Sequence, residues 1–325
     1  MALRIGYVPE HFAAPLLKLA ESAWGRANIE LVAQPSGTGQ MLSSLDTADQ
    51  KIDVAVALTE GLIAGIARGR TDYRLVGSYV RTSLNWAIIT GTSPGAQKYQ
   101  SISDLRGSRV GISRIGSGSQ LMASVLALRE GWTDSQGHVE SLDFVVNNDF
   151  KTLRDGVNQA PGHETGFFMW EWFTTKPFQD SGEVRFIGSI PTPWPSWTIA
   201  ASTAALQPGR VEILRKFLEE LDAHIRGFAN PTTRADRSLQ RYIEHVHNYK
   251  PEDVDQWAAG VRWAGEETPD PSGAESNGDA LKINTYTLST GIIRHTLHVL
   301  GEAGVVERKE WDIQPFVSPE TTHII

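Results

Sequence analysis

The sequence predicts an α/β protein with two lobes, in which mostly parallel strands are flanked by helices. The first observation is a repeated order of strand, loop and helix, found three times near the N-terminus and three times again after residue 108. Strands that alternate with helices form parallel sheets. The second observation is the length of 325 residues, which is typical of two domains rather than three. The third is a pair of extended segments between the two repeats.

Each expected strand of the first repeat ends in small or polar residues, just before helical spacing resumes. The strands are Leu3–Val8, Ile29–Ala33 and Asp53–Leu58. The loops after them contain Pro9-Glu10-His11, Ser36-Gly37-Thr38-Gly39 and Thr59-Glu60-Gly61. Ligands of open α/β sheets sit beyond the carboxyl ends of the strands. We therefore expect these loops to form one wall of a cleft.

The second repeat supplies the opposite wall in the same order. Its expected strands are Arg109–Ser113, Leu142–Val146 and Gly166–Met169. They lead into Arg114-Ile115-Gly116-Ser117-Gly118-Ser119, Asn147-Asn148 and Trp170-Glu171-Trp172-Phe173. Two copies of one organisation predict two lobes whose loops face each other.

Two connections are expected between the lobes. Tyr73–Tyr79 and Trp86–Thr90 are extended segments around the first crossing, and a return is expected near Ile187–Thr203, where prolines interrupt any helix. The predicted lobes are therefore residues 1–91 with 195–325, and residues 92–194.

The last third of the sequence predicts mainly helices. Val211–Phe228 has apolar residues at helical spacing, and Asp236–His247, Pro251–Trp263 and Leu281–Glu302 are further expected helices. Gly265–Asp279 is acidic, contains Gly, Pro and Ser, and is expected to be an exposed loop.

Composition excludes several classes of function. The formal net charge of −8 disfavours nonspecific binding to nucleic acid or to anionic membranes, and the absence of cysteine excludes thiolate catalysis and disulfides. No segment has the ~20 apolar residues that a transmembrane helix needs. The N-terminus runs directly into a strand without a secretory signal, so we expect a cytoplasmic protein.

The candidate ligand contacts are residues at the carboxyl ends of the expected strands and at the first crossing. In the first lobe and the crossing they are Glu10, Gly37, Thr38, Gly39, Thr59, Glu60 and Asn85. In the second lobe they are Arg114, Gly116, Ser117, Gly118, Ser119, Asn147, Trp170 and Glu171. Other roles stay open, because Thr59 and Asn147 are also suited to capping helices and Asn85 to tying the hinge.

The segment Gly116–Ser119 before an expected helix is the best local signal for a ligand. Small residues let the backbone approach a ligand, and the N–H groups of a first helical turn favour an anion. Arg114 could add a charge-assisted bond. Leu121 replaces the third glycine of a dinucleotide fingerprint, and no Gly-Lys-Ser/Thr follows as in a phosphate-binding P-loop. The alternative is a tight turn capped by Ser117 or Ser119.

Tryptophan is frequent, with 10 residues, and several fall at expected loops or crossings: Trp86, Trp170, Trp172, Trp194 and Trp197. Indole faces suit a flat heteroaromatic or sulfonate-bearing ligand. Core packing is favoured for all of them except Trp170, which directly follows its strand. Glu171 either accepts bonds from a ligand amine or is a solvated or ion-paired carboxylate.

No metal, cofactor or catalytic group is expected. His245 and His247, and likewise His295 and His298, lack a convincing third ligand nearby. Neither a serine-nucleophile elbow nor a catalytic dyad pattern is present in the sequence.

Several segments, taken in chain order, resemble the type II periplasmic binding proteins. They are Gly6-Tyr7-Val8-Pro9-Glu10, Ser36-Gly37-Thr38-Gly39, Lys51-Ile52-Asp53-Val54-Ala55, Asp104-Leu105-Arg106-Gly107 and Phe168-Met169-Trp170-Glu171. The similarity is to the sulfonate, nitrate and thiamine-precursor branch, often called NMT1/THI5-like. More narrowly, Met169–Pro177 in a chain without a leader resembles the cytosolic fungal Ca3427-like group. The resemblance covers roughly the first two-thirds of the chain.

This resemblance implies a two-lobed fold of mixed sheets with two hinge crossings. It also implies a small anionic or heteroaromatic ligand, similar to a pyrimidine precursor of thiamine or to a sulfonate. An enzyme of the wider family makes that pyrimidine from pyridoxal phosphate and one of its own histidines. The matched positions here are Ala57 and Gly61, which cannot supply the lysine or the histidine. Solute binding is therefore expected, and the alternatives are an enzyme of thiamine or pyrimidine metabolism and a protein-interaction module with a vestigial cleft.

Overall fold

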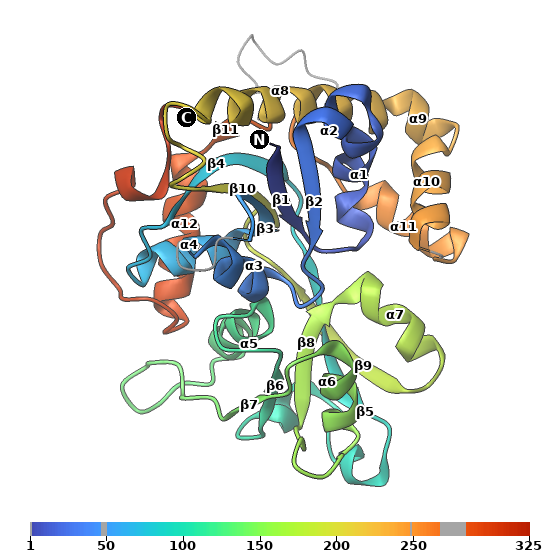
Figure 1. The fold of residues 1–325 in the computed structure, drawn as a ribbon. Helices are drawn as coiled ribbons and strands as arrows, with labels where there is room; N and C mark the ends of the chain where they lie inside the picture. The colour runs from blue at the N-terminus through green and yellow to red at the C-terminus, as the bar shows by residue number, and fades with distance from the viewer. Residues whose placement is uncertain (1, 47–50, 248, 267–283) are drawn as a thin grey trace, which may run out of the picture.

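The computed structural model describes residues 2–46, 51–247, 249–266 and 284–325. It contains two five-stranded mixed sheets flanked by helices, one above the other in Figure 1. We call the part built on the upper sheet lobe I and the part built on the lower sheet lobe II. The expected α/β class with mixed sheets is confirmed.

The sheet of lobe I has the strand order β2-β1-β3-β10-β4. Its strands are β1 (Leu3–Tyr7), β2 (Ile29–Ala33), β3 (Val54–Leu58), β4 (Tyr73–Val80) and β10 (Trp197–Ser202). β1 pairs in parallel with β2 and β3, whereas β10 is antiparallel to both β3 and β4. The apolar β3 is buried along its whole length, as expected for a central strand.

Helices cover lobe I on both sides of this sheet (Figure 1). They are α1 (Ala14–Glu21), α2 (Ala23–Asn28), α3 (Thr38–Leu45), α4 (Thr59–Ala67), α8 (Val211–Phe228), α9 (Pro231–Ala235), α10 (Ser238–His247), α11 (Pro251–Gly260) and α12 (Thr290–Glu302). Short elements complete the lobe: 3₁₀ turns at His11–Ala13 and Gln314–Phe316, and the strand pair β11 (Thr287–Leu288) and β12 (His323–Ile324).

The sheet of lobe II has the strand order β7-β6-β8-β5-β9. Its strands are β5 (Asn85–Gly91), β6 (Val110–Ile112), β7 (Phe144–Val146), β8 (Phe167–Glu171) and β9 (Val184–Pro191). Its helices are α5 (Gly118–Arg129), α6 (Phe150–Val157) and α7 (Trp172–Asp180), with 3₁₀ turns at Pro94–Ala96 and Ile102–Leu105. β5 runs antiparallel to its neighbours β8 and β9.

The expected lobe boundary at residue 91 is corrected by the pairing of β5. Because β5 hydrogen-bonds to β8 and β9, residues 85–91 belong to the sheet of lobe II. The chain therefore crosses between the sheets at residues 81–84 and returns at residues 192–196. The pattern of the sequence indicates two strands here, but it does not indicate which sheet each strand joins.

Three of the expected helices have different bounds. The helix expected over Asp236–His247 begins at Ser238, because Arg237 before it has a φ of 61°, and a separate short helix, α9, precedes it. The helix expected over Pro251–Trp263 ends at Gly260, since residues 262–264 bond along the end of β4. The helix expected over Leu281–Glu302 begins at Thr290, where the Ser289 side chain accepts a bond from Ile292 N–H. Residues 281–283 and the part of the acidic loop from 267 to 279 lie outside the described residues.

A buried ion cluster joins the start of β3 to the entrance of α8. The Asp53 carboxylate accepts hydrogen bonds from the side chains of Arg4 and Arg210 at 3.0–3.1 Å. Burial by itself would raise the pKa of Asp53, but these bonds lower it to about 2. The cluster ties together segments that are far apart in the sequence.

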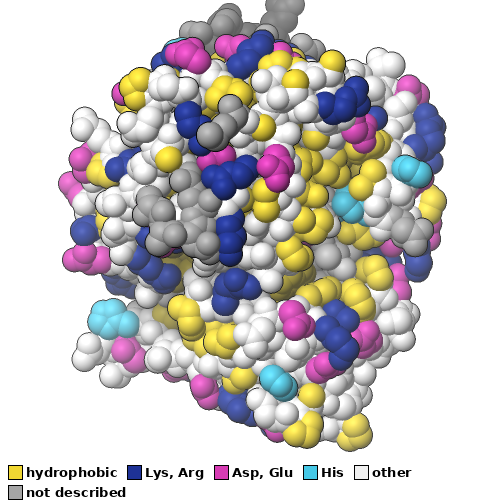
Figure 2. All heavy atoms as spheres, in the orientation of Figure 1, with side chains coloured by type: hydrophobic (Ala, Val, Ile, Leu, Met, Phe, Trp, Pro, Cys, Tyr) yellow, Lys and Arg dark blue, Asp and Glu magenta, His cyan; other side chains and the backbone are white. Residues whose placement is uncertain are grey.

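Basic and acidic side chains are interspersed over the face of the molecule shown in Figure 2, with hydrophobic side chains between them. Within the described residues, no helix is both long and apolar enough to cross a bilayer. Nor do the described residues contain a group of three or more side chains able to hold a metal ion.

Candidate functional site

A narrow cavity lies between the lobes, where the carboxyl ends of strands from both sheets meet. Its lining residues are Val8, Glu10, Ser36, Gly37, Thr38, Leu58, Leu84, Trp86, Ser113, Ser117, Gly118, Ser119, Trp170, Glu171 and Trp197. The cavity has a volume of about 50 Å³, which holds a few water molecules rather than a drug-sized ligand. The two lobes are therefore closed on each other in this structure.

About half of the expected site residues line this cavity. They are Glu10, Gly37, Thr38, Ser117, Gly118, Ser119, Trp170 and Glu171. The expected residues outside the lining are Gly39, Thr59, Glu60, Asn85, Arg114, Gly116 and Asn147.

One helix of each lobe begins at the cavity, and the two helix starts have the same construction. In α3 the side-chain carbonyl of Gln40 accepts a bond from Ser36 N–H at 2.9 Å. In α5 the side-chain carbonyl of Gln120 accepts a bond from Gly116 N–H at 2.6 Å. Each glutamine thus reaches back to the residue before the cap. The N–H groups of Gln40 and Gln120 bond to the carbonyls of Gly37 and Ser117, whereas the first two N–H groups of each helix have no acceptor within the helix. Such N–H groups favour an anionic or acceptor-rich ligand.

Three serines surround the start of α5. Ser117 is the N-cap of this helix, and its hydroxyl lies 2.9 Å from that of Ser119. The Ser119 hydroxyl also accepts a weak bond from Ser113 N–H at 3.4 Å. The capping role and the lining role of Ser117 are thus combined in one residue.

Two tryptophans in the cavity wall have no partner for their indole N–H groups. Trp86 and Trp197 are each only 4% exposed, and both Nε1 atoms lack a hydrogen-bond partner. The edge of the Trp86 ring next to its N–H lies against Gly118 at the start of α5. A buried donor without a partner is costly, so a ligand acceptor is the natural partner for these groups. The sequence analysis favoured core packing for both tryptophans. Their position at strand ends beside the crossings is the feature of the sequence that could have indicated a place in the cavity wall.

Two buried glutamates also line the cavity. Glu10 follows β1, and Glu171 ends β8. Burial, together with the charge of Glu171, raises the pKa of Glu10 to about 8. Burial raises the pKa of Glu171 to about 7, although Thr174 donates hydrogen bonds to it from both its hydroxyl and its N–H group.

His11 lies behind these carboxylates in an aromatic cluster. Its ring packs edge-on against Phe173, Tyr249 and Trp257, with ring centroids 4.6–5.7 Å apart. Burial, followed by the nearby His247, lowers the pKa of His11 well below its ordinary value. Because Phe173 belongs to lobe II and the other aromatic residues to lobe I, this cluster joins the lobes beside the cavity.

Trp170 and Glu171 are the last residues of β8, whereas the sequence analysis placed them after the strand. The Trp170 ring stacks on Phe150, with centroids 5.0 Å apart and planes 24° apart. One face of this indole is therefore already covered, which leaves less aromatic surface for a ligand than expected.

Thr59 and Glu60 hold the return crossing instead of facing the cavity. The Thr59 hydroxyl lies 2.7 Å from that of Thr198, and Glu60 accepts a bond from the indole N–H of Trp194 at 2.8 Å. The N-cap of α4 is Leu58, so the capping alternative for Thr59 is wrong.

The remaining expected residues also lie outside the cavity lining. Asn147 bonds to the carbonyl and ring of His163, while Asp149 caps α6, so Asn147 neither lines the cavity nor caps its helix. Asn85 is exposed at the start of β5. Arg114 packs over Gly39 of lobe I, where an added Cβ would lie 2.5 Å from its Cδ.

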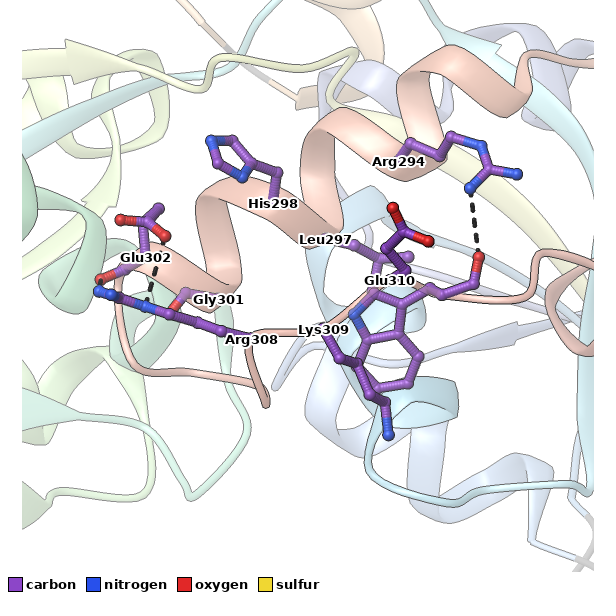
Figure 3. A pocket seen from close by; sticks show the side chains of 9 residues that line it. Arg294, Leu297, His298, Gly301, Glu302, Arg308, Lys309 and Glu310 are labelled. Atoms are coloured by element: carbon purple, nitrogen blue, oxygen red, sulfur yellow. Dashed lines mark hydrogen bonds and ion pairs between the residues drawn. The ribbon is translucent and has the colours of Figure 1, made fainter.

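A second cavity, of about 180 Å³, lies between α12 and the segment that follows it (Figure 3). Arg294 donates to the Trp311 carbonyl, Arg308 pairs with Glu302, and Lys309 pairs with Glu307. The cations around this cavity already have partners, and the cavity lies away from the strand ends. It is therefore a weaker candidate for the ligand site.

A family model described as Ca3427-like PBP matches residues 86–190, which correspond to lobe II from β5 to β9. Among solved structures, the CA3427 gene product of Candida albicans, described as having the generic periplasmic binding protein fold, is 29% identical. The match has a TM-score of 0.80 and covers 99% of this chain and 97% of that chain. The resemblance to the Ca3427-like group is confirmed.

More distant structures share the fold. The periplasmic aliphatic sulphonate binding protein SsuA of Escherichia coli is 16% identical, with a TM-score of 0.57 over 99% of this chain and 93% of that chain. The periplasmic nitrate-binding protein NrtA of Synechocystis PCC 6803 is 12% identical, with a TM-score of 0.63 over 95% and 83%. No curated protein sequence matches the chain. The chain therefore has the two-sheet architecture of periplasmic binding proteins.

Proposed function

We propose that this chain is a solute-binding protein that closes its two lobes on a small ligand. The observation that carries the proposal is a cavity lined from both lobes, in which the buried N–H groups of Trp86 and Trp197 have no partner among the residues that the structure describes. The helix starts of α3 and α5 add further donors from opposite walls. These donors suit a ligand with an anionic or acceptor-rich group, including a heteroaromatic ring. The sulfonate- and nitrate-binding proteins that share the fold agree with this ligand class.

Entry of such a ligand requires the lobes to separate, because the cavity is small in the closed form. Salt bridges between the lobes, Lys176–Asp253 and Lys250–Asp180, are both 3.1 Å long and break on opening. The connections at residues 81–84 and 192–196 are the proposed hinge. The Lys250–Asp180 pair is largely exposed and contributes little stability, whereas the Lys176–Asp253 pair is mostly covered and has to be hydrated on opening.

Native mass spectrometry of freshly purified protein tests this function by detecting a co-purifying small molecule. We expect one molecule per chain, and titration calorimetry with it should give saturable binding. Trp86→Ala should weaken that binding, whereas Trp311→Ala beside the second cavity should not. If no small molecule co-purifies or binds while a protein partner is retained, the chain is instead an interaction module.

Enzymatic use of pyridoxal phosphate is not supported by the residues at the cleft. Ala57 is buried within β3, Gly61 packs against Thr38, and no lysine is among the cavity-lining residues. We therefore expect borohydride reduction with added pyridoxal phosphate to leave no stoichiometric adduct on a cleft residue in peptide maps. A cytoplasmic location stays a prediction, and imaging the tagged full-length chain in its own cell tests it.

A further inference from the structure

We propose that the cleft recognises a positively charged hydrogen-bond donor, such as a primary amine or a protonated aminoheterocycle, between Glu10 of lobe I and Glu171 of lobe II. This inference rests on the proposed solute-binding function and names the chemical class of its ligand. The ligand would carry an acceptor group as well as this donor group.

The two carboxylates come from different lobes but face the same space. Both line the cavity, and Glu10 and Glu171 are only 9% and 7% exposed. The Thr174 hydroxyl lies 3.4 Å from Glu10 Oε2 and 2.6 Å from Glu171 Oε2, so these two oxygens are within about 6 Å of each other. A hydroxyl has a single hydrogen and donates fully to only one carboxylate. The hydroxyl is closer to Glu171, so Glu10 does not receive a strong hydrogen bond from it.

The described part of the chain supplies no cation to this pair of carboxylates. Across the residues that the structure describes, His11 is the only basic side chain in ion-pair range of either carboxylate, at 3.9 Å from Glu171. His11 is neutral because burial and the nearby His247 lower its pKa. Tyr249, which also faces the carboxylates, stays protonated because burial raises its pKa. Two buried carboxylates without a cation cannot both ionise at low cost.

Closure brings the two negative charges together, so either a proton or a ligand cation must compensate them. A proton compensates only one carboxylate and makes no contact with the donors of the cavity wall. A ligand amine can donate to both carboxylates at once, and each charge-assisted bond is stronger than a neutral one. The cation would thereby link lobe I to lobe II.

Other residues of the same cavity offer the complementary chemistry. Trp86 lies opposite Glu171 in the pair of strands β5 and β8, and the indole N–H groups of Trp86 and Trp197 and the start of α5 are donors in the cavity wall. Acceptors and donors in one cavity match a ligand that carries both kinds of group, such as an amino acid analogue or an amino-substituted heterocycle. A purely anionic solute would leave the two glutamates unpaired.

The test uses two matched pairs of probes on the full chain: taurine with ethanesulfonate, and 4-aminopyrimidine with pyrimidine. Calorimetry at pH 7 should give a dissociation constant at least about tenfold lower for an amine-bearing probe than for its partner, a difference typical of one charge-assisted bond. Glu10→Gln and Glu171→Gln should abolish this preference. Glu60→Gln is the control, because Glu60 is fully buried but lies outside the cavity lining, and a glutamine carbonyl can still accept the bond from Trp194.

A second measurement separates recognition from a structural role. Without ligand, Glu10→Gln should melt at a higher temperature than the wild type at pH 8.5 and at the same temperature at pH 5.5, because the substitution removes a buried charge. A structural role for Glu10 predicts the opposite change. The inference is overturned if amine-free probes bind as well as amine-bearing ones, or if Glu10→Gln keeps the preference.

If none of the four probes binds, the molecule that co-purifies with the protein tests the inference. A basic nitrogen in that molecule, with binding lost in Glu10→Gln, supports the inference, and its absence overturns it. If nothing co-purifies and no probe binds, the solute-binding function itself fails together with this inference. Binding without an amine preference leaves the function intact and removes only the cation site.

Discussion

Replacing Gly118 with alanine should weaken ligand binding while leaving both lobes folded. Gly118 is the first residue of α5, and a Cβ added there would lie 2.7 Å from Leu58 Cδ1 and 2.8 Å from Trp86 Cη2. Leu58 belongs to lobe I, so the new methyl group would obstruct the closed arrangement of the lobes. The helical backbone at this position accepts alanine, which is also the better helix former.

The size of the loss in affinity depends on whether Leu58 or Trp86 moves to make room for the new methyl group. The Leu58 methyl group ends a flexible side chain, whereas the buried Trp86 ring cannot move without disturbing its strand. Overpacking of this kind costs about 1–3 kcal/mol. The clash with Leu58 arises only when the lobes close, whereas the clash with Trp86 lies within lobe II and is present in the open form as well. Because only the Leu58 part opposes closure, the dissociation constant of the ligand should rise roughly 5- to 30-fold, the equivalent of about 1–2 kcal/mol.

Titration calorimetry with the co-purified ligand measures the affinity, and small-angle scattering with and without ligand measures closure. Gly209→Ala is the control, because a Cβ there meets no atom within 4 Å. Both variants should have far-ultraviolet circular dichroism spectra like the wild type. Affinity within twofold of the wild type, with normal closure, would refute the packing of α5 against Leu58 and Trp86.

The remaining predictions concern pH, the ion cluster and the indole donors. The pKa values of Glu10 and Glu171 are raised by burial to about 8 and about 7, so the folded state binds more protons than the unfolded state between about pH 4.5 and pH 8. The free energy of unfolding contributed by the protonated forms should therefore fall as pH rises through this window. Urea denaturation at pH 5.5 and at pH 8.5 measures this fall. An equal or greater free energy of unfolding at pH 8.5 contradicts the prediction. The pKa of Asp53 is lowered to about 2, so its ionised carboxylate contributes stability above about pH 4, and this contribution is lost on acidification. In the same assay, Asp53→Asn should lower the free energy of unfolding at pH 7 by about 3 kcal/mol. A loss below about 1 kcal/mol would show that the two arginines find other partners. Trp86→Phe removes an indole N–H that has no partner among the described residues and, counting its nitrogen, three ring atoms of a buried side chain, so it should lower affinity by at least about 1 kcal/mol and also lower the melting temperature. Trp311→Phe is its control, and an unchanged affinity for Trp86→Phe means that the indole N–H does not contact the ligand.

Local patterns were sufficient for most elements of the fold. The bounds of β2 and α8 match the expectation from sequence, because strand alternation and helical spacing are properties of neighbouring residues. The rule that ligands lie at the carboxyl ends of strands correctly brought Glu10, Gly37 and Ser117 to one cavity.

The errors arose where the outcome depends on contacts between distant residues. β5 joins the sheet of lobe II through its pairing with β8 and β9, which its own residues do not reveal. Glu60 Oε2 accepts a bond from Trp194 and Asn147 bonds to His163, and both side chains lie outside the cavity lining. Trp197, which lines the cavity, resembles any buried aromatic residue when only the sequence is known.

The position of β10 sets the order in which the lobes can be completed during synthesis. Lobe II is one continuous stretch from Asn85 to Pro191, so all its strands are present once that stretch has emerged. β3 and β4 are made earlier but do not pair with each other, because β10 lies between them. Their facing edges stay open until β10 arrives, and open edges invite pairing with other chains. The nascent chain therefore finishes its second lobe first, and lobe I is the part that needs protection from aggregation until then.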